Sequence, residues 1–253
     1  MTEHIVVKDA DATRTIAMQR PDKKNALTQA MYLAMSAAID SAQSDSAIRC
    51  LAITGAPGVF TAGNDLEDFL KAGTANDGTK RPSAALTFLH SLANNTKPLV
   101  AAVDGFAVGI GTTLIFHCDY VIASTNAKFS TPFIHLGLVP EGASSLLVPR
   151  ALGHQRAFSM LVMGRTVTGA DAKDFGFVND VVAPDQLEAQ TRKVTQEICA
   201  LPAEAVAISR KLLKPPPQDL IARIEQESAL FGERMRSAEA IGAFQSFLAR
   251  KRA

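Results

Sequence analysis

The chain has 253 residues, 47% of them hydrophobic and 20% charged, and its 26 basic and 25 acidic side chains leave a net charge of +1. This length is sufficient for one large domain with a full hydrophobic core. The nearly neutral charge argues against nucleic acid as the main partner, because phosphate binding needs a surplus of Lys and Arg on one face. No run of about 18 uncharged apolar residues occurs, so no membrane-spanning segment is expected. We therefore expect a soluble protein with a small-molecule partner.

The three cysteines, Cys50, Cys118 and Cys199, lie far apart in the sequence and form no CxxC motif. Their odd number and spacing argue against a disulfide framework and against a cysteine zinc site. His117 and His135 lack the spacing of a metal-ligand pair, so a packed, hydrogen-bonded role is the better interpretation. We therefore expect no metal and no separate cofactor, and a reducing, cytoplasmic location.

The first part of the chain combines short apolar runs with one amphipathic segment. Thr28 is placed to cap a helix, and apolar residues follow it at helical spacing. The runs CLAIT and LVAAV are apolar throughout, which is typical of strands buried on both faces of a sheet. The predicted elements are strands at 4–9 and 13–19, a helix at 28–42, strands at 50–54 and 99–103, and a polar loop at 72–83.

The second part of the chain begins as mixed α/β and ends as helix alone. The predicted elements are a helix at 112–116, a strand at 120–123, helices at 154–163 and 168–175, and a strand at 177–182. A later helix is expected to be interrupted at Gly232, and Ser237 is placed to cap the last one. We predict an α/β core over residues 1–200 and a helical region over residues 201–253. The apolar faces of that region must dock on the core or on a neighbouring subunit.

Two segments share one pattern, in which an apolar strand is followed by small residues, glycine and a helix start. They are residues 59–66 (VFTAGNDL) and residues 105–114 (GFAVGIGTTL). A helix start presents unpaired N–H groups, and glycine lets another molecule approach the backbone closely. Two such N–H groups aimed at one point would form an oxyanion hole. Taken alone, each segment is better explained as an ordinary tight turn next to a strand.

A third segment, residues 129–153, is apolar, rich in turns and almost uncharged. Its acid, Glu141, is either an exposed turn residue or a base whose pKa is raised by desolvation. Ser144 and Ser145 lack a GxSxG elbow, which argues against a serine hydrolase.

Four motifs in order now carry a family resemblance. They are Pro21-x-x-x-Asn25-Ala26-Leu27, Ala62-Gly63-Asn64-Asp65, Gly109-x-Gly111 and the 129–153 segment. Over nearly its whole length the sequence resembles the crotonase (enoyl-CoA hydratase/isomerase) superfamily. The resemblance implies an α/β fold, a crotonase-like spiral of ββα units with a helical C-terminal trimerisation region. It also implies an acyl-CoA thioester as partner and a homotrimer or a dimer of trimers.

The resemblance also implies the site residues. The oxyanion-hole N–H groups belong by matching position to Asn64 and Ile110, and the base to Glu141. The positions matched to substrate binding are Asn25, Ala26, Leu27, Ala62, Gly63, Asp65, Leu66, Gly109 and Phe133.

The reaction type follows from which carboxylates are present. The hydratase pattern has two glutamates at the places held here by Thr113 and Phe133, and neither residue can accept the proton that hydration must move. The Glu141 region instead resembles the peroxisomal-type Δ3,Δ2-enoyl-CoA isomerases, in which one carboxylate moves a proton from C2 to C4. A hydratase, another acyl-CoA enzyme of this fold, and a non-catalytic acyl-CoA binder remain alternatives.

Several other charged residues have a simpler interpretation. Asp65 follows a glycine turn and is expected to cap a helix rather than to act as an acid. Asp104 and Asp119 are expected to be structural or solvated. Lys24 and Lys214 could meet CoA phosphates, as could Lys211, but solvated side chains are the better expectation.

Overall fold

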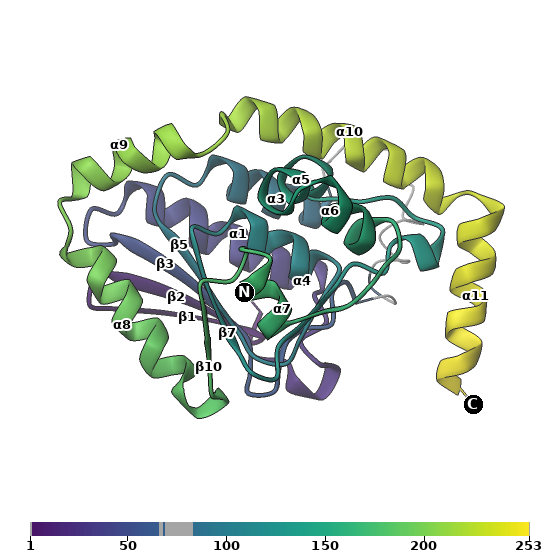
Figure 1. Ribbon diagram of the computed structural model, residues 1–253, viewed down its shortest axis with the longest axis horizontal. Helices are drawn as coiled ribbons and strands as arrows, with labels where there is room; N and C mark the ends of the chain where they lie inside the picture. Colours follow the sequence, from purple (N-terminus) through teal and green to yellow (C-terminus); the bar gives the residue numbers. More distant parts are fainter. Residues whose placement is uncertain (1, 66–67, 69–82, 253) are drawn as a thin grey trace.

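The computed structural model describes residues 2–65, 68 and 83–252, with side chains as far as residue 246. Two β-sheets form its centre, and helices pack around them (Figure 1). The larger sheet has the order β1 (Ile5–Ala10), β2 (Thr13–Met18), β3 (Cys50–Thr54), β5 (Leu99–Val103), β7 (Tyr120–Ser124), β10 (Asp180–Val182). The smaller has the order β4 (Val59–Thr61), β6 (Phe106–Val108), β8 (Lys128–Ser130), β9 (Val167–Thr168).

Helices supply the rest of the described regular structure. The α-helices are α1 (Gln29–Ser44), α3 (Ala84–Asn94), α4 (Ile110–Thr113), α5 (Ser144–Leu152), α6 (His154–Leu161), α7 (Gly169–Asp174), α8 (Leu187–Ala200), α9 (Ala203–Leu213), α10 (Pro217–Met235) and α11 (Ala238–Arg252). Short 3-10 turns are η1 (Pro21–Lys23), η2 (Leu114–His117), η3 (Ile134–Leu136) and η4 (Pro184–Gln186).

From β3 to β8, successive strands alternate between the two sheets. β3, β5 and β7 are parallel neighbours in the larger sheet, and β4, β6 and β8 are parallel neighbours in the smaller one. Each repeat, a pair such as β3 and β4, therefore adds one strand to each sheet. This is the predicted spiral of ββα units, and the α/β fold class is confirmed.

The larger sheet is covered on both faces, as the apolar strands predict. Along β5, Leu99, Ala101 and Val103 join the main core, which includes residues of α1 and α3. Val100 and Ala102 point the other way, into a smaller cluster with residues of α8. This alternation follows from the two-residue period of a strand, and it explains why no polar residue interrupts LVAAV.

Asp104 ties together the turns that precede the short strands. Its Oδ2 accepts a 2.6 Å hydrogen bond from the amide of Gly58, just before β4, and its Oδ1 accepts one of 2.6 Å from the hydroxyl of Ser124, at the end of β7. Asp104 itself precedes β6. One carboxylate therefore joins three successive repeats, which confirms the structural interpretation of this residue.

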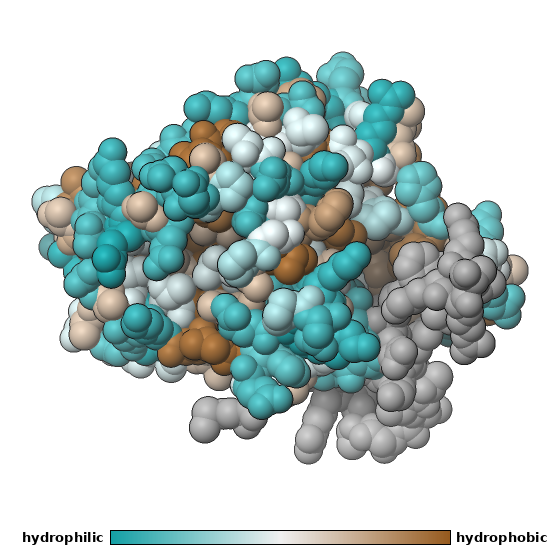
Figure 2. All heavy atoms as spheres, turned by 90° about the horizontal axis from the view of Figure 1, so that it is seen from below, coloured by the Kyte–Doolittle hydropathy of each residue, from teal (hydrophilic) through white to brown (hydrophobic). Residues whose placement is uncertain are grey.

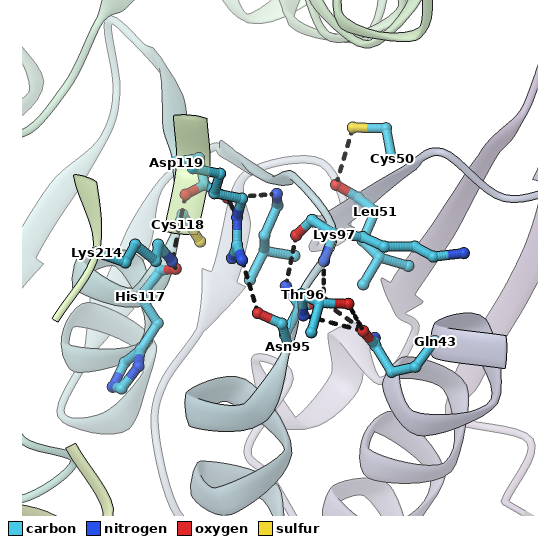
Figure 3. A network of polar contacts seen from close by, with 12 residues as sticks. Gln43, Cys50, Leu51, Asn95, Thr96, Lys97, His117, Cys118, Asp119 and Lys214 are labelled. Carbon is cyan, nitrogen blue, oxygen red and sulfur yellow. Dashed lines mark hydrogen bonds and ion pairs between the residues drawn. The ribbon is translucent and has the colours of Figure 1, made fainter. Parts of the chain in front are cut away.

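The chain after Leu201 is helical, and α9 and α10 run along one side of the core (Figure 1). α9 is anchored by charge: Arg210 Nε donates to Asp119 Oδ2 at 2.7 Å, and Lys214 Nζ lies 3.3 Å from Asp119 Oδ1 (Figure 3). Lys214 also donates to the carbonyl oxygen of His117. The expectation of a solvated Lys214 is therefore wrong, because an aspartate at the start of β7 pairs with it. His117 has the packed role that was expected.

Some predicted boundaries differ from the structure. α10 continues through Gly232, since its packing elsewhere along the helix outweighs the preference of one glycine. Ser237 Oγ accepts from the amide of Ala240 and caps α11, as predicted. The strand expected at 177–182 is shorter in the structure, where β10 covers only Asp180–Val182. Just before it, Asn179 binds Val121 twice: its amide donates to the carbonyl oxygen of Val121, and its side-chain Oδ1 accepts from the amide of Val121.

Three further differences concern helices. The helix expected at 112–116 begins at Ile110 as α4 and continues as the 3-10 turn η2. The sequence analysis did not predict α3 or α5, and α5 contains Pro149, a residue that normally argues against a helix interior. The polar segment 72–83 lies outside the described residues except for Ser83, which caps α3.

On the face shown in Figure 2, hydrophilic residues predominate and hydrophobic ones form small, separate patches. The apolar side chains of Leu212 and Leu213, at the end of α9, are 82% and 86% exposed. Among the described helices, none combines the length and the apolar character needed to cross a membrane.

Candidate active site

The two glycine turns lie side by side at the ends of β4 and β6. These strands pair in parallel, with Thr61 opposite Ala107. A Cβ atom on Gly63 would lie 2.8 Å from the carbonyl oxygen of Val108, and one on Gly111 would lie 2.4 Å from Cγ2 of Thr61. Both positions therefore require glycine, since any larger residue would separate the turns.

Each turn carries a backbone N–H group that has no acceptor within residues 2–65, 68 and 83–252. Leu27 donates to the carbonyl of Gly63, and Asp65 donates to the carbonyl of Leu27, so the bridge between these segments does not use the amide of Asn64. Ile110 is the first residue of α4, where helical hydrogen bonds have not yet begun. In the described part of the chain neither amide meets an acceptor. Two such donors on adjacent turns can stabilise a developing oxyanion.

Glu141 is half-buried in the turn before α5. Its Oε1 accepts a 2.8 Å hydrogen bond from the hydroxyl of Thr113 in α4. The pKa of Glu141 is raised to about 7, chiefly by burial and also by the nearby carboxylate of Glu227, while the hydrogen bond from Thr113 acts in the opposite direction. A carboxyl group with this pKa can both take up and release a proton near neutrality.

Tyr32 is a hydrogen-bond partner of the first glycine turn. Its ring is fully buried in α1, and its hydroxyl donates a 2.5 Å hydrogen bond to Oδ1 of Asn64. Its pKa is raised well above the usual value, chiefly by burial and also by the carboxylate of Glu141. The sequence analysis missed Tyr32, although a tyrosine on an apolar helix face signals a buried hydroxyl that needs a partner.

The side chain of Asn25 binds the protein backbone and so supports the site. Its side chain is completely buried: Oδ1 accepts from the amide of Arg20, and Nδ2 donates to the carbonyls of Val59 and Phe60. This network holds residues 24–27 against the start of the first glycine turn. Asn25 therefore has no side-chain atom left for a ligand.

The Asp65 side chain is engaged by the protein. Its Oδ2 lies 2.7 Å from Nη1 of Arg20, and its Oδ1 accepts from the amide of Asp68. This arrangement confirms the expected capping role. In the described residues, no three His, Cys, Asp or Glu side chains gather where they could hold a metal ion.

Comparison with known sequences identifies the family. The sequence model of enoyl-CoA hydratase/isomerase matches residues 9–253. The chain belongs to this family, the crotonase superfamily. The predicted resemblance is therefore confirmed over almost the whole length of the chain.

Individual relatives agree with this assignment. The chain is 34% identical over 250 residues to enoyl-CoA delta isomerase 2 of Rattus norvegicus, covering 98% of this chain but 64% of the rat protein. It therefore spans a little under two thirds of that relative's length. An enoyl-CoA hydratase/isomerase structure from Pseudoalteromonas atlantica T6c superposes with a TM-score of 0.92, 32% identity and 98% coverage of both chains. The structure of Pseudomonas aeruginosa OdaA superposes at 0.91, with 40% identity, covering 97% of this chain and 99% of that one.

The remaining predicted contact residues of this crotonase lie around the same turns. Ala26 and Ala62 are half-buried, and Leu27 is buried. The ring of Phe133 lies 3.7 Å from where a Cβ atom on Gly109 would be, and it packs in a cluster with residues of α11. Leu66 lies outside the described residues. The described residues among them thus come together from segments that are far apart in the sequence.

Proposed function

We propose that this crotonase is a Δ3,Δ2-enoyl-CoA isomerase. The observation that carries the proposal is Glu141, a carboxyl group with a pKa raised to about 7, in a site that also holds two backbone N–H groups with no acceptor among the described residues. An isomerase needs one base that can later act as an acid, and donors for the oxygen of the intermediate. The rat relative named as an enoyl-CoA delta isomerase supports the same assignment.

The proposed reaction moves one proton. The carboxylate of Glu141 takes a proton from C2 of a 3-enoyl-CoA, and the electrons of that C–H bond form a dienolate whose negative oxygen accepts from the amides of Asn64 and Ile110. The protonated Glu141 then returns the proton to C4, and the double bond lies between C2 and C3. The glutamate regains its charge, so the cycle needs no further reactant.

The side chains around Glu141 favour isomerisation over hydration. The hydroxyl of Thr113 donates a hydrogen bond to Glu141, and Thr113 supplies no second carboxylate. Phe133, only 6% exposed, supplies none either. Asp65 is paired with Arg20, and Asp119 with Arg210 and Lys214, so neither is available to activate water.

We further propose how the substrate and subunits are arranged. The thioester would pass along the two glycine turns, with contacts at Asn25, Ala26, Leu27, Ala62, Gly63, Asp65, Leu66, Gly109 and Phe133; for Asn25 only backbone contacts are available. The exposed apolar end of α9 supports assembly into a homotrimer or a dimer of trimers. The three cysteines are unpaired, which agrees with a reducing compartment such as the cytoplasm.

Turnover of defined thioesters tests the activity. Purified protein should convert 3-hexenoyl-CoA to 2-hexenoyl-CoA and should hydrate crotonyl-CoA very slowly. Glu141→Gln should lose about 10²- to 10⁴-fold in kcat while still binding acyl-CoA. Glu188→Gln, an exposed change on α8, is the matched control and should leave turnover unaltered.

Other outcomes would favour the alternatives. Fast hydration of crotonyl-CoA would indicate a hydratase, and tight binding of acyl-CoA without any turnover would indicate a binding protein. Near-normal isomerisation by Glu141→Gln would exclude Glu141 as the base.

A further inference from the structure

A second buried carboxylate, Glu227, reaches the turn that carries Glu141. It lies in α10, is only 4% exposed, and comes from a part of the chain 86 residues away in sequence. Its two oxygens accept three hydrogen bonds at the start of α5: from the amide of Ala143 at 2.6 Å, from the amide of Ser145 at 2.9 Å, and from the hydroxyl of Ser145 at 2.5 Å. Glu227 therefore caps this helix from outside its own segment.

The turn between Glu141 and α5 has a backbone that needs such support. Gly142 and Ala143 both have positive φ values, +73° and +59°, and the second of these is unfavourable for a residue with a side chain. No side chain within the turn caps α5. The turn is held from two sides instead, since the ring Nε2 of His117 lies 2.7 Å from the carbonyl oxygen of Gly142.

Glu227 also places a negative charge near the base. Burial raises the pKa of Glu227, while its hydrogen bonds from Ser145 and Ala143 and the charge of Arg223 act in the opposite direction. Arg223, one helical turn earlier in α10, also donates to the Ser145 hydroxyl. The carboxylate of Glu227 in turn raises the pKa of Glu141.

The other titratable groups around these two carboxylates, within the described residues, do not cancel this effect. Burial lowers the pKa of His117 in η2 to about 4, so its ring is neutral at pH 7. Tyr32 in α1 is neutral because its pKa is raised. The remaining groups on packed helices are His90 of α3, which faces Glu225, the exposed Arg150 of α5, and Arg234 with Glu239 between α10 and α11.

We propose that Glu227 is the positioning residue for the Glu141 base, holding its turn through the start of α5 and keeping a second negative charge beside it. The inference rests on the proposed role of Glu141 in proton transfer. It assigns to α10 a task in the reaction in addition to packing, because removing Glu227 would change both the geometry and the basicity of the base.

The first test measures the base without relying on catalysis. Carboxyl ¹³C NMR titration of the full-length protein gives the pKa of Glu141, with its signal assigned by its loss in Glu141→Gln. In Glu227→Gln the pKa of Glu141 should fall by roughly one unit, because ionisation no longer creates two neighbouring charges. Glu225→Gln removes a charge from the exposed side of the same helix, and there the pKa should not move.

The second test measures turnover of 3-hexenoyl-CoA. Glu227→Gln should lower kcat about tenfold or more and leave KM within about twofold, since Glu227 does not reach the substrate. The acidic inflection of its pH profile should move to lower pH. Glu227→Asp keeps the charge but shortens the reach, so kcat should fall while the pKa of Glu141 stays raised.

The outcomes separate the two proposals. An unchanged pKa of Glu141 in folded Glu227→Gln, or a lower melting temperature with unchanged kcat, would reduce Glu227 to an ordinary helix cap and overturn the inference. If Glu227→Gln does not fold, a kcat of Glu227→Asp equal to that of the parent would overturn it. Absence of isomerisation by the parent protein would instead contradict the proposed function, and the NMR titration would still decide whether Glu227 tunes Glu141.

Discussion

The hydroxyl of Thr113 donates a 2.8 Å hydrogen bond to Oε1 of Glu141. Thr113 stands at a position where the hydratase pattern has a glutamate. Here it is a direct hydrogen-bond partner of the proposed base. A hydrogen bond to the charged form favours that form, and Thr113 accordingly lowers the pKa of Glu141.

Removing this hydroxyl should make Glu141 harder to ionise. In Thr113→Val the acidic inflection of the kcat/KM profile for isomerisation should move to higher pH by about one unit, since a hydrogen bond to a charged group contributes about 1.5–3 kcal/mol. Activity at pH 7 should fall accordingly. Thr113→Ser keeps the donor and should retain the parent inflection, and equal inflections in all three proteins would show that the hydrogen bond has no influence on the base.

The raised pKa of Glu141 should appear in stability as well as in activity. Between its ordinary value of 4.5 and about 7, the unfolded chain is ionised while the folded protein keeps the proton, so stability contributed by this group falls as pH rises through that window. The difference between the two values corresponds to on the order of 3 kcal/mol. Glu141→Gln should therefore match the parent near pH 4.5 and be more stable at pH 8.

Urea unfolding at pH 5 and at pH 8, at one protein concentration, measures this difference. Glu188→Gln, on the surface of α8, should give the same small effect at both pH values. A Glu141→Gln variant that is equally destabilised at both would mean that the carboxyl is well solvated in the folded protein.

The amide of Ile110 can be tested by deleting it. Ile110→Pro removes the N–H at the first position of α4, where a helix tolerates proline, and should cost on the order of 10²-fold or more in kcat. Ile110→Val keeps the amide and most of the buried side chain, and should stay within severalfold of the parent. Circular dichroism establishes that both variants fold, and full activity of a folded proline variant would remove this donor from the mechanism.

Assembly is the fourth expectation. The protein should sediment as a trimer or hexamer rather than as a 26.9 kDa monomer. Replacing Leu212 and Leu213 together with Asp should favour smaller species, because these side chains are 82% and 86% exposed in the isolated chain. Leu33→Asp, at a 51% exposed position of α1, serves as the comparison. A monomeric parent at micromolar concentration would contradict the proposed assembly.

Much of the fold could be predicted from the sequence, because its central strands are short and apolar and clear turn signals separate them. CLAIT and LVAAV had to be buried on both faces, and both are. The helix α5 could not be predicted, because Pro149 argues against it locally and the contact that caps it comes from Glu227, far away in sequence.

The glycine turns of the site could be predicted from the sequence, but the residues that support these turns and the base could not. At Gly63 and Gly111 two segments of the chain approach so closely that only glycine fits. The glycines of these motifs can therefore be recognised in the sequence. Tyr32 and Glu227 leave no such pattern. A tyrosine on an apolar face indicates that its hydroxyl needs a partner but not which one, and a glutamate in a long helix gives no signal until its hydrogen-bond partners are known.

The bonds of Asp104 to Gly58 and Ser124 lie at one end of the short strands β4, β6 and β8, and the turns with Asn64 and Ile110 lie at the other. Anchorage and chemistry therefore occupy opposite ends of the same three strands. The anchored end restrains the strands against one another, while the far end can change its side chains without loosening them. Such a division lets one scaffold carry different acids and bases at its active end while the anchored end keeps the three strands together.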